Sequence, residues 1–410
     1  MAGAGLLILR GVVGLAGRLR IEQVARNLKA QLKQELAHMA ESEFPVLSGN
    51  PQDCNLAERY RGALVELARR QSAEGRPQGD VKFETQTASR PCLEWLRESE
   101  RCGVCDWFPE GELASAEDEQ LLRKGVSLVS SRTLAVWKGF LAAAGSADEA
   151  AALVLELLRF SECVATARLA MRLSGMQVAG EAIGALTMLV AEGRLASEGS
   201  LRRVAAQLDV LEDSLPSVAE GIRVEALALA VSLAELHKEK GERGSLEGWL
   251  PSYTVAAYRL QRDEALIREM IDAVDIRNLG ALRRASESIR TRASHSGSEW
   301  LSEGLPNLYT SRVVQEHLVA RYRILRTAVD LELVRLRMGE YPDGVSSDAL
   351  RDDPFSLGQR LRYQRKGSGY RLWSVGVAGL DGEVEGRDGS LVIEVPVSKQ
   401  RVVEDPTPAS

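Results

Sequence analysis

The sequence predicts a mainly α-helical protein of antiparallel helical hairpins that ends in a long helix and a small antiparallel β-sheet. Composition is the first observation: aromatic residues make up 5% of the 410 residues, and Leu, Ala, Arg and Glu are abundant, as in helices packed through aliphatic side chains. Periodicity is the second observation. Apolar residues recur at helical spacing as far as residue 338, and beyond it they alternate with polar residues as in strands.

The N-terminal segment, residues 1–42, combines an apolar run with an amphipathic helix. Residues 2–17 are apolar apart from Arg10, and apolar residues then follow at helical spacing between charged ones: Ile21, Val24, Leu28, Leu32 and Leu36. The run is short for a transmembrane helix, and no basic residue precedes it as in a signal peptide. Two hypotheses stay open: a frayed amphipathic helix, and an export signal or anchor that would associate with a membrane.

Residues 43–115 are predicted to be rich in loops, apart from one helix at residues 55–70, because Pro, Gly, Ser and Gln break the helical pattern. Four of the five cysteines lie in this segment: Cys54, Cys92, Cys102 and Cys105. Four thiolates can close a tetrahedral zinc site, and Cys102 and Cys105 have the two-residue spacing that such sites use. Structural disulfides in an exported protein, a redox-active pair and free thiols are the alternatives.

Residues 116–305 are predicted to form a helical body whose short loops make neighbouring helices antiparallel. Two helix starts have the Ser and Glu spacing of a capping box, and three glycines follow helical runs as C-terminal caps. These residues are Ser146 with Glu149, Ser217 with Glu220, and Gly175, Gly193 and Gly241. Cys163 shares a helical stripe with Phe160 and Ala167, which predicts a place in the core.

The C-terminal segment, residues 306–400, is predicted to hold a long helix at residues 307–338 and a β cap. Gly339 and Pro342 end the helix, because neither residue continues one well. Alternating residues on either side of a four-residue, Gly-rich loop at residues 366–369 predict a hairpin, and residues 391–395 predict a third strand. Residues 401–410 are predicted to be a disordered tail.

The order of features in this segment resembles the C-terminal part of the major pseudopilin of type II secretion systems. The likeness rests on LRMGEYP at the end of the long helix, the Asp-Pro-Phe stretch at Asp353, the Leu-Arg-Tyr stretch at Leu361 and GYRLWSVG from Gly369. It covers residues 325–396 and implies a long helix, a short antiparallel sheet and a calcium-binding loop. The resemblance also implies partners from a secretion or pilus-type system.

A second resemblance concerns the order of the whole chain. Four features follow one another along the chain: an apolar N-terminus, a Cys-Asp-Trp stretch at residues 105–107, an apolar run at residues 171–193 in a helical middle, and the pseudopilin-like end. In this order the chain resembles a group of bacterial envelope proteins that has no assigned activity. The resemblance implies a helical body that is anchored or exported at the cell envelope.

The pseudopilin resemblance also implies one candidate metal site, in the loop after the hairpin. Calcium binds about six to eight oxygen atoms, mostly from carboxylates and carbonyls. The candidate ligands are the carbonyl of Leu372 and the side chains of Ser374, Asp381 and Asp388. Ala378 stands where the family usually has an acidic residue, so a metal-free loop closed by hydrogen bonds is the alternative. We expect no other cofactor.

The remaining polar residues form no motif that identifies a reaction. The sequence lacks the glycine-rich, HExxH and GxSxG motifs of nucleotide-binding proteins, zinc proteases and hydrolases. His237, which precedes Gly241, is predicted to lie in the last turn of a helix, where a cation stabilises the helix dipole. Asp352 and Asp353 are expected at a helix start or a loop edge, in solvated or capping roles. We therefore favour a protein without enzymatic activity.

The charge balance indicates which classes of partner the chain can bind. With 52 basic and 58 acidic residues the formal net charge is -6, so the chain has no basic field that would hold a nucleic-acid backbone. We interpret the chain as a scaffold or interaction protein of the bacterial cell envelope, with protein partners related to secretion or pilus-type systems. The alternative is a soluble cytoplasmic protein that depends on zinc or thiols through the four cysteines Cys54, Cys92, Cys102 and Cys105.

Overall fold

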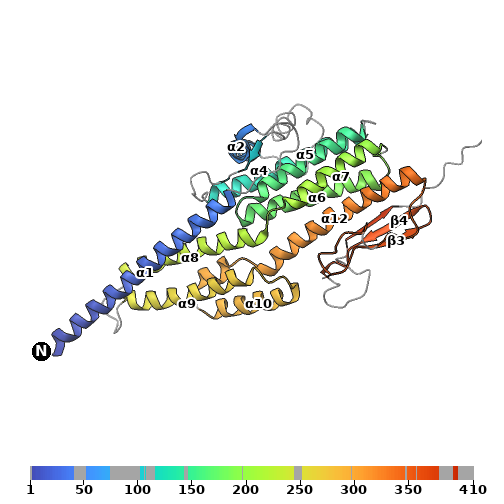
Figure 1. Cartoon of the computed structure of the whole chain (residues 1–410). Helices are drawn as coiled ribbons and strands as arrows, with labels where there is room; N and C mark the ends of the chain where they lie inside the picture. Colours follow the sequence, from blue (N-terminus) through green and yellow to red (C-terminus); the bar gives the residue numbers. More distant parts are fainter. Residues whose placement is uncertain are drawn as a thin grey trace, which may run out of the picture. The chain divides into compact units, whose positions relative to one another are not determined.

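The computed structural model describes residues 2–40, 52–73, 102–105, 107, 116–142, 146–195, 197–243, 252–296, 298–346, 349–356, 358–377 and 391–395. Helices dominate these residues (Figure 1), and their β structure consists of a two-stranded pair and a three-stranded C-terminal sheet. The predicted fold class, mainly helical with a long helix and a small antiparallel sheet at the C-terminal end, is confirmed.

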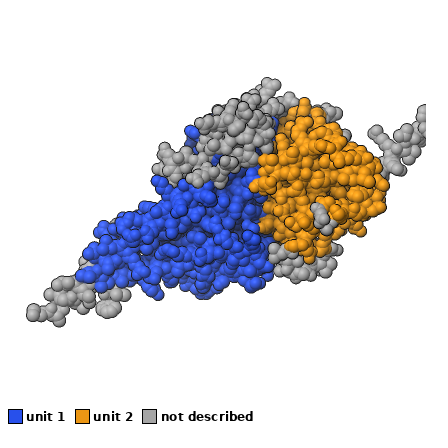
Figure 2. All heavy atoms as spheres, viewed as in Figure 1, with its two compact units in different colours: residues 1–133, 156–179, 214–315 blue, residues 134–155, 180–213, 316–410 orange. Residues whose placement is uncertain are grey.

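The chain divides into two compact units, each built from separate stretches of sequence (Figure 2). Unit 1 comprises residues 1–133, 156–179 and 214–315, and unit 2 comprises residues 134–155, 180–213 and 316–410. Both units therefore draw on the segment that was expected to form one helical body.

Three helices of unit 1 pack side by side: α1 (Ala2–Ala40), α8 (Val218–Arg243) and α9 (Ser252–Ala273). Of the five apolar residues predicted on one face of α1, Ile21, Leu28 and Leu36 are buried, and Val24 and Leu32 are partly exposed. At Gly17 the backbones come close, because an added Cβ would lie 2.8 Å from the carbonyl oxygen of Tyr253. α10 (Leu279–His295) packs on α9, and α11 (Glu299–Gly304) packs on α10.

Unit 1 also contains all of α2 (Leu56–Ala73) and parts of α4 (Ala116–Ala142), α5 (Ala147–Ala165) and α6 (Leu169–Ala191). The helix predicted at residues 55–70 is α2. Tyr60 of α2 contacts Phe160 of α5 edge to face, with ring centroids 5.0 Å apart. Before α2, β1 (Gln52–Asn55) pairs in parallel with β2 (Cys102–Val104), so this loop-rich segment also holds a short strand pair.

In unit 2, α7 (Glu198–Asp213) lies beside α12 (Leu308–Met338), which belongs to this unit from residue 316. Ion pairs join the two helices along their length: Arg323 with Glu212, Arg326 with Asp209 and Arg337 with Glu198, at 2.6, 3.0 and 2.7 Å. The predicted long helix is confirmed within one residue at its start. It ends before Gly339, whose φ of +83° is unfavourable for other residues.

The C-terminal sheet consists of β3 (Arg362–Lys366), β4 (Gly369–Trp373) and β5 (Val392–Val395), antiparallel in the order β3-β4-β5. Tyr370 and Leu372 of β4 are fully buried, whereas the alternate residues Arg371 and Trp373 are partly exposed. Leu372 lies opposite Ile393, which is also buried. The predicted hairpin and third strand are therefore confirmed, and their alternation arises from one buried face.

Both predicted helix starts are confirmed. α5 begins after Ser146, whose Oγ accepts a hydrogen bond from the backbone N–H of Glu149 at 3.4 Å. α8 begins after Ser217, whose Oγ accepts from the N–H of Ala219 at 3.2 Å. The hydroxyl groups thus satisfy N–H groups that have no partner inside the helix.

Two of the three predicted helix ends are wrong. Gly193 follows α6 with a φ of +64°, as predicted, but Gly175 lies inside α6 and Gly241 lies inside α8. At Gly175 the physical reason is helix packing. An added Cβ would meet the carbonyl oxygen of Ser161 and would lie 2.8 Å from the backbone nitrogen of Ala165, so this glycine allows α5 and α6 to approach closely.

Candidate functional site

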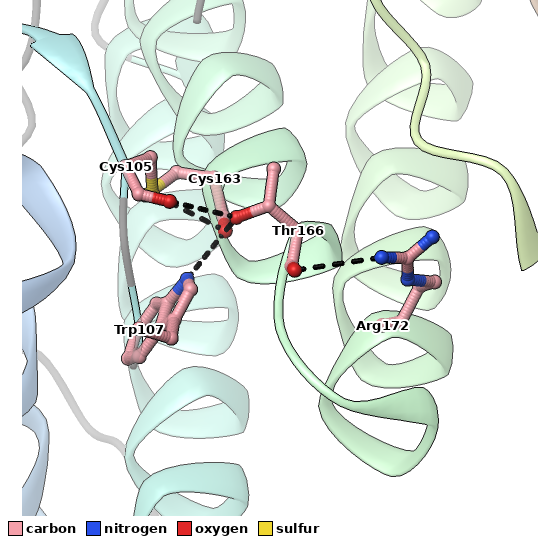
Figure 3. The surroundings of a disulfide bond; sticks show 5 residues. All are labelled: Cys105, Trp107, Cys163, Thr166 and Arg172. Atoms are coloured by element: carbon pink, nitrogen blue, oxygen red, sulfur yellow. Dashed lines mark hydrogen bonds between the residues drawn. A yellow bond between two sulfur atoms is a disulfide. The ribbon is translucent and has the colours of Figure 1, made fainter. Parts of the chain in front are cut away.

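A disulfide between Cys105 and Cys163 is the centre of a dense polar cluster in unit 1 (Figure 3). Cys105 directly follows β2, and Cys163 lies near the C-terminal end of α5. Their Cα atoms are 5.8 Å apart, a separation typical of disulfides. Both residues are buried, with exposed fractions of 7% and 0%. The bond ties the segment after β2 to α5 across 58 residues of sequence.

The carbonyl oxygen of Cys163 is the acceptor on which this cluster converges. It lies in the last turn of α5, where carbonyl groups have no partner inside the helix. The indole N–H of Trp107 donates to it at 2.7 Å, and the hydroxyl of Thr166 donates at the same distance. The Thr166 hydroxyl also lies 3.2 Å from the carbonyl oxygen of Cys105. Figure 3 shows these side chains gathered around the disulfide.

Arg172 extends the cluster toward the start of α8. This fully buried guanidinium donates to the carbonyl oxygens of Thr166 and Ala167 in the turn between α5 and α6, at 3.4 and 3.3 Å. It also donates to the carbonyl of Ser217 and to Glu220. Burial lowers the pKa of Arg172, although the Glu220 carboxylate favours the charged form. The arginine therefore links the two helix junctions through hydrogen bonds.

The burial of the disulfide decides what chemistry it supports. Exchange requires a thiolate to reach one of the two sulfurs along the S–S axis. Because Cys105 and Cys163 are buried, such an attack would require the cluster to open. The arrangement therefore fits a structural cross-link, which stabilises the fold by restricting the unfolded chain.

The four cysteines considered as zinc ligands are not all placed by the structure. Cys105 is bonded to Cys163, and a sulfur in a disulfide is not a thiolate ligand. The backbones of Cys54 and Cys102 lie in the paired strands β1 and β2, and Cys92 lies outside the described residues. The partner of Cys105 is thus the cysteine that the sequence analysis assigned only to the core.

In the C-terminal β cap, Asp353 accepts hydrogen bonds from residues that follow β4. Its carboxylate is 3% exposed and accepts hydrogen bonds from the hydroxyl of Ser374 and from the N–H groups of Phe355 and Val375, at 2.8, 3.0 and 2.9 Å. Of the two expected roles, solvated or capping, Asp353 therefore has the capping one, because it accepts from the N–H groups of Phe355 and Val375. Its neighbour Asp352 is exposed and pairs with Arg360 at 2.9 Å.

Two of the four candidate calcium ligands belong to the described residues. Leu372 is a buried residue of the central strand β4, and the Ser374 hydroxyl donates its proton to Asp353. Asp381 and Asp388 lie outside the described residues, so the calcium hypothesis stays a prediction. Within the described parts of the chain, no three His, Cys, Asp or Glu side chains are grouped as metal ligands.

His237 has a different role from the predicted one. α8 continues through Gly241 to Arg243, so His237 does not lie in its last turn. The ring is buried, and its Nε2 lies 3.3 Å from a carboxylate oxygen of Asp263 on α9, which is 1% exposed. The prediction of a helix-dipole cap is therefore wrong: the histidine joins α8 to α9 inside the bundle.

Sequence reasoning missed Arg172 and Asp263 as polar residues of the interior. For Arg172 a signal was present, because it stands among apolar residues in the run at residues 171–193. A buried charge in such a place must find partners, which predicts hydrogen bonds to nearby carbonyls. For Asp263 no local signal of burial was present, because the neighbouring residues Arg262 and Glu264 are charged.

The N-terminal part of α1 exposes apolar side chains. Val12, Leu15 and Leu19 lie on one face of the helix, with exposed fractions of 59, 58 and 54%. The carbonyl of Val13 in α1 accepts from Thr254 near the start of α9, and in Figure 1 the first turns of α1 extend beyond the ends of α8 and α9. This part of α1 therefore has an apolar surface that the described residues of unit 1 leave uncovered.

Only α6 among the described residues is long and apolar enough to cross a membrane by length and composition. The apolar window of α6 is 61% buried within the protein, as expected for the core helix of a globular protein.

Comparisons with known proteins leave the chain to be interpreted from its own residues. No family model, no curated protein and no solved structure matches it.

Proposed function

We propose that the protein is a non-enzymatic scaffold or interaction protein of the bacterial cell envelope, related to secretion or pilus-type systems. The observation that carries the proposal is the buried Cys105–Cys163 disulfide with its supporting shell of hydrogen bonds. Stable disulfides belong to oxidising compartments, whereas the cytosol keeps thiols reduced. A cross-link built into the core thus favours an exported protein over the cytoplasmic alternative.

The exposed face of α1 supports the membrane part of this proposal. Val12, Leu15 and Leu19 present an apolar strip, and residues 2–20 carry three arginines and no acidic residue. A helix with apolar and basic side chains binds at a membrane surface, where anionic lipids attract the arginines. We take this segment as the membrane-associated end of the protein.

The C-terminal part of unit 2 supports the link to secretion or pilus-type systems. A long helix, a turn, an antiparallel hairpin and a third strand follow one another in the order that the pseudopilin resemblance implies. Asp353 joins the Asp-Pro-Phe stretch to Ser374 in the stretch GYRLWSVG, two of the sequences on which that resemblance rests. We assign the binding of protein partners to the helices of unit 1.

Fractionation of cells that express the full-length natural gene tests the proposal. The protein should sediment with membranes, and Leu15→Glu/Leu19→Glu should move it to the soluble or periplasmic fraction, because a charge on this face opposes insertion. Met188→Glu/Val210→Glu is the matched control, since both residues are also exposed and apolar, at 49 and 42%. A wild-type protein found wholly in the cytosol, independent of salt, would contradict the proposal.

A further inference from the structure

A groove between α9 and α10 in unit 1 has a cationic rim. It encloses about 340 Å³, and its lining combines Ala265 and Leu266 with Arg262, Glu269, Arg292 and His295. Arg292 pairs with Glu269 across the groove, so the acidic residue of the lining is already occupied. Arg262 is 41% exposed at its side chain and reaches the buried Asp263 with one nitrogen at 3.4 Å. The groove thus offers an apolar floor, and Arg262 on its rim has guanidinium N–H groups that its one contact to Asp263 does not use.

The outer face of α10 also carries an excess of positive charge. Residues 276–296 contain five arginines and one glutamate, a local formal charge of +4 in a chain whose net charge is -6. The inner face of the helix is buried through Leu279, Leu282 and Ile289, so the arginines lie outside. Arg284 and Arg290 are exposed, and neither has an ion-pair partner among the described residues. The excess of positive charge is therefore available to a ligand.

We propose that the α9–α10 groove and the outer face of α10 bind an acidic polypeptide segment of a protein partner. Guanidinium groups bind carboxylates through paired hydrogen bonds, and unpaired arginines on a rim increase the rate of association with an acidic partner. The apolar floor at Ala265 and Leu266 takes an aliphatic side chain between the acidic residues. The choice of a polypeptide rests on the proposed interaction function, but the binding itself does not depend on cellular location.

Two observations favour a polypeptide over a lipid surface. A helix that binds in the membrane interface inserts large apolar side chains. The exposed large apolar residues of the described chain lie on α1, α6, α7, α9, α12 and β5, and α10 has none. The surface is also concave at the groove, which suits side chains of a peptide better than a flat layer of headgroups.

Binding of a fluorescein-labelled peptide of repeated Glu-Glu-Leu to the purified full-length protein tests the proposal by fluorescence anisotropy. The wild type should bind at low ionic strength, and added salt should weaken binding because the charges lie at the surface. Arg284→Glu/Arg290→Glu should raise Kd by roughly tenfold, while the control should stay within about twofold. The control, Arg123→Glu/Arg203→Glu, changes the net charge equally at exposed positions on α4 and α7.

Three results would overturn the proposal. The first is no binding by the wild type at low ionic strength. The second is equal weakening by both double variants, which would mean that net charge alone attracts the peptide. The third is displacement of the peptide by phosphatidylglycerol vesicles that bind through Arg284 and Arg290, which would assign the surface to lipid. Each result leaves the envelope location intact, because fractionation tests that location separately.

Discussion

Asp353 is the residue that holds the loop before the C-terminal sheet to the loop after β4. Its buried carboxylate accepts three hydrogen bonds, from Ser374, Phe355 and Val375. Asp353→Asn replaces one acceptor oxygen by a donor, so it should lower the free energy of unfolding by about 1–3 kcal/mol, measured by urea titration. Asp352→Asn is the control: its side chain is 62% exposed and, among the described residues, paired only with Arg360, so its effect should be small. Equal effects of the two variants would contradict this role.

Two buried tyrosines of unit 2 differ in their partners. The hydroxyl of Tyr341 donates to Glu332, a residue that is 2% exposed, whereas the hydroxyl of Tyr370 has no hydrogen-bond partner among the described residues. Tyr341→Phe should therefore destabilise the protein by about 1–3 kcal/mol, and Tyr370→Phe should be neutral or slightly stabilising. Thermal unfolding of the two variants checks this order, and the reverse order would refute it.

The same tyrosines predict a loss of stability at alkaline pH. Burial and the nearby Glu332 carboxylate raise the pKa of Tyr341 and that of Tyr370 above the usual value of about 10. The folded protein therefore holds these protons more tightly than the unfolded chain. Their stabilising contribution is complete below about pH 10 and decreases as the pH rises above it. Melting temperatures from pH 8 upward should fall less steeply for Tyr341→Phe/Tyr370→Phe than for the wild type; parallel curves would contradict this explanation.

At the residue scale the sequence predicts apolar burial better than polar burial. Ile21, Leu28 and Leu36 follow from helical spacing alone. Asp353, His237 and Asp263 do not, because their burial depends on partners that are far away in the sequence.

At the scale of elements, glycines inside α6 have two different roles. Gly175 is buried against α5, whereas Gly184 is exposed with nothing within 4 Å of an added Cβ. Gly175→Ala should destabilise the protein by about 1–3 kcal/mol through overpacking, and Gly184→Ala should stabilise it by about 0.5–1 kcal/mol through helix propensity. Urea titrations of both variants measure the difference. A stabilising Gly175→Ala would show that α5 and α6 do not pack this closely.

Local signals explain which elements the sequence predicts. Serine caps start α5 and α8, and the change of period from 3.6 to 2 marks the passage from α12 to the hairpin. Glycine is ambiguous, because a C-terminal cap at Gly193 and a helix contact at Gly175 look alike in sequence. The parallel pairing of β1 with β2 joins residues about 50 positions apart, which no local pattern reveals.

At the scale of the whole molecule, both units are assembled from stretches that are distant in sequence. A linear division at changes of composition cannot predict such units, because they are defined by contacts. The pairing of Cys105 with Cys163 likewise depends on contacts between stretches that are distant in sequence. Spacing predicts that cysteines near one another could pair, but connectivity follows from the packing of α5 against the segment after β2.

The disulfide should contribute substantially to global stability. It restricts a span of 58 residues in the unfolded chain, which corresponds to about 4 kcal/mol in the chain-entropy description. Cys105→Ala/Cys163→Ala should therefore lower the free energy of unfolding by about 2–5 kcal/mol. Dithiothreitol should destabilise the wild type and leave this double variant unchanged. A variant as stable as the oxidised wild type would show that the bond does not stabilise the fold.

The redox state of Cys105 and Cys163 inside growing cells tests the envelope account most directly. Cells that express the full-length natural gene are quenched in acid, free thiols are alkylated, and the peptides that contain the two cysteines are identified by mass spectrometry without reduction. The account predicts that the two peptides are joined by a disulfide, because an exported chain meets an oxidising compartment. Recovery of both cysteines as alkylated thiols would contradict it.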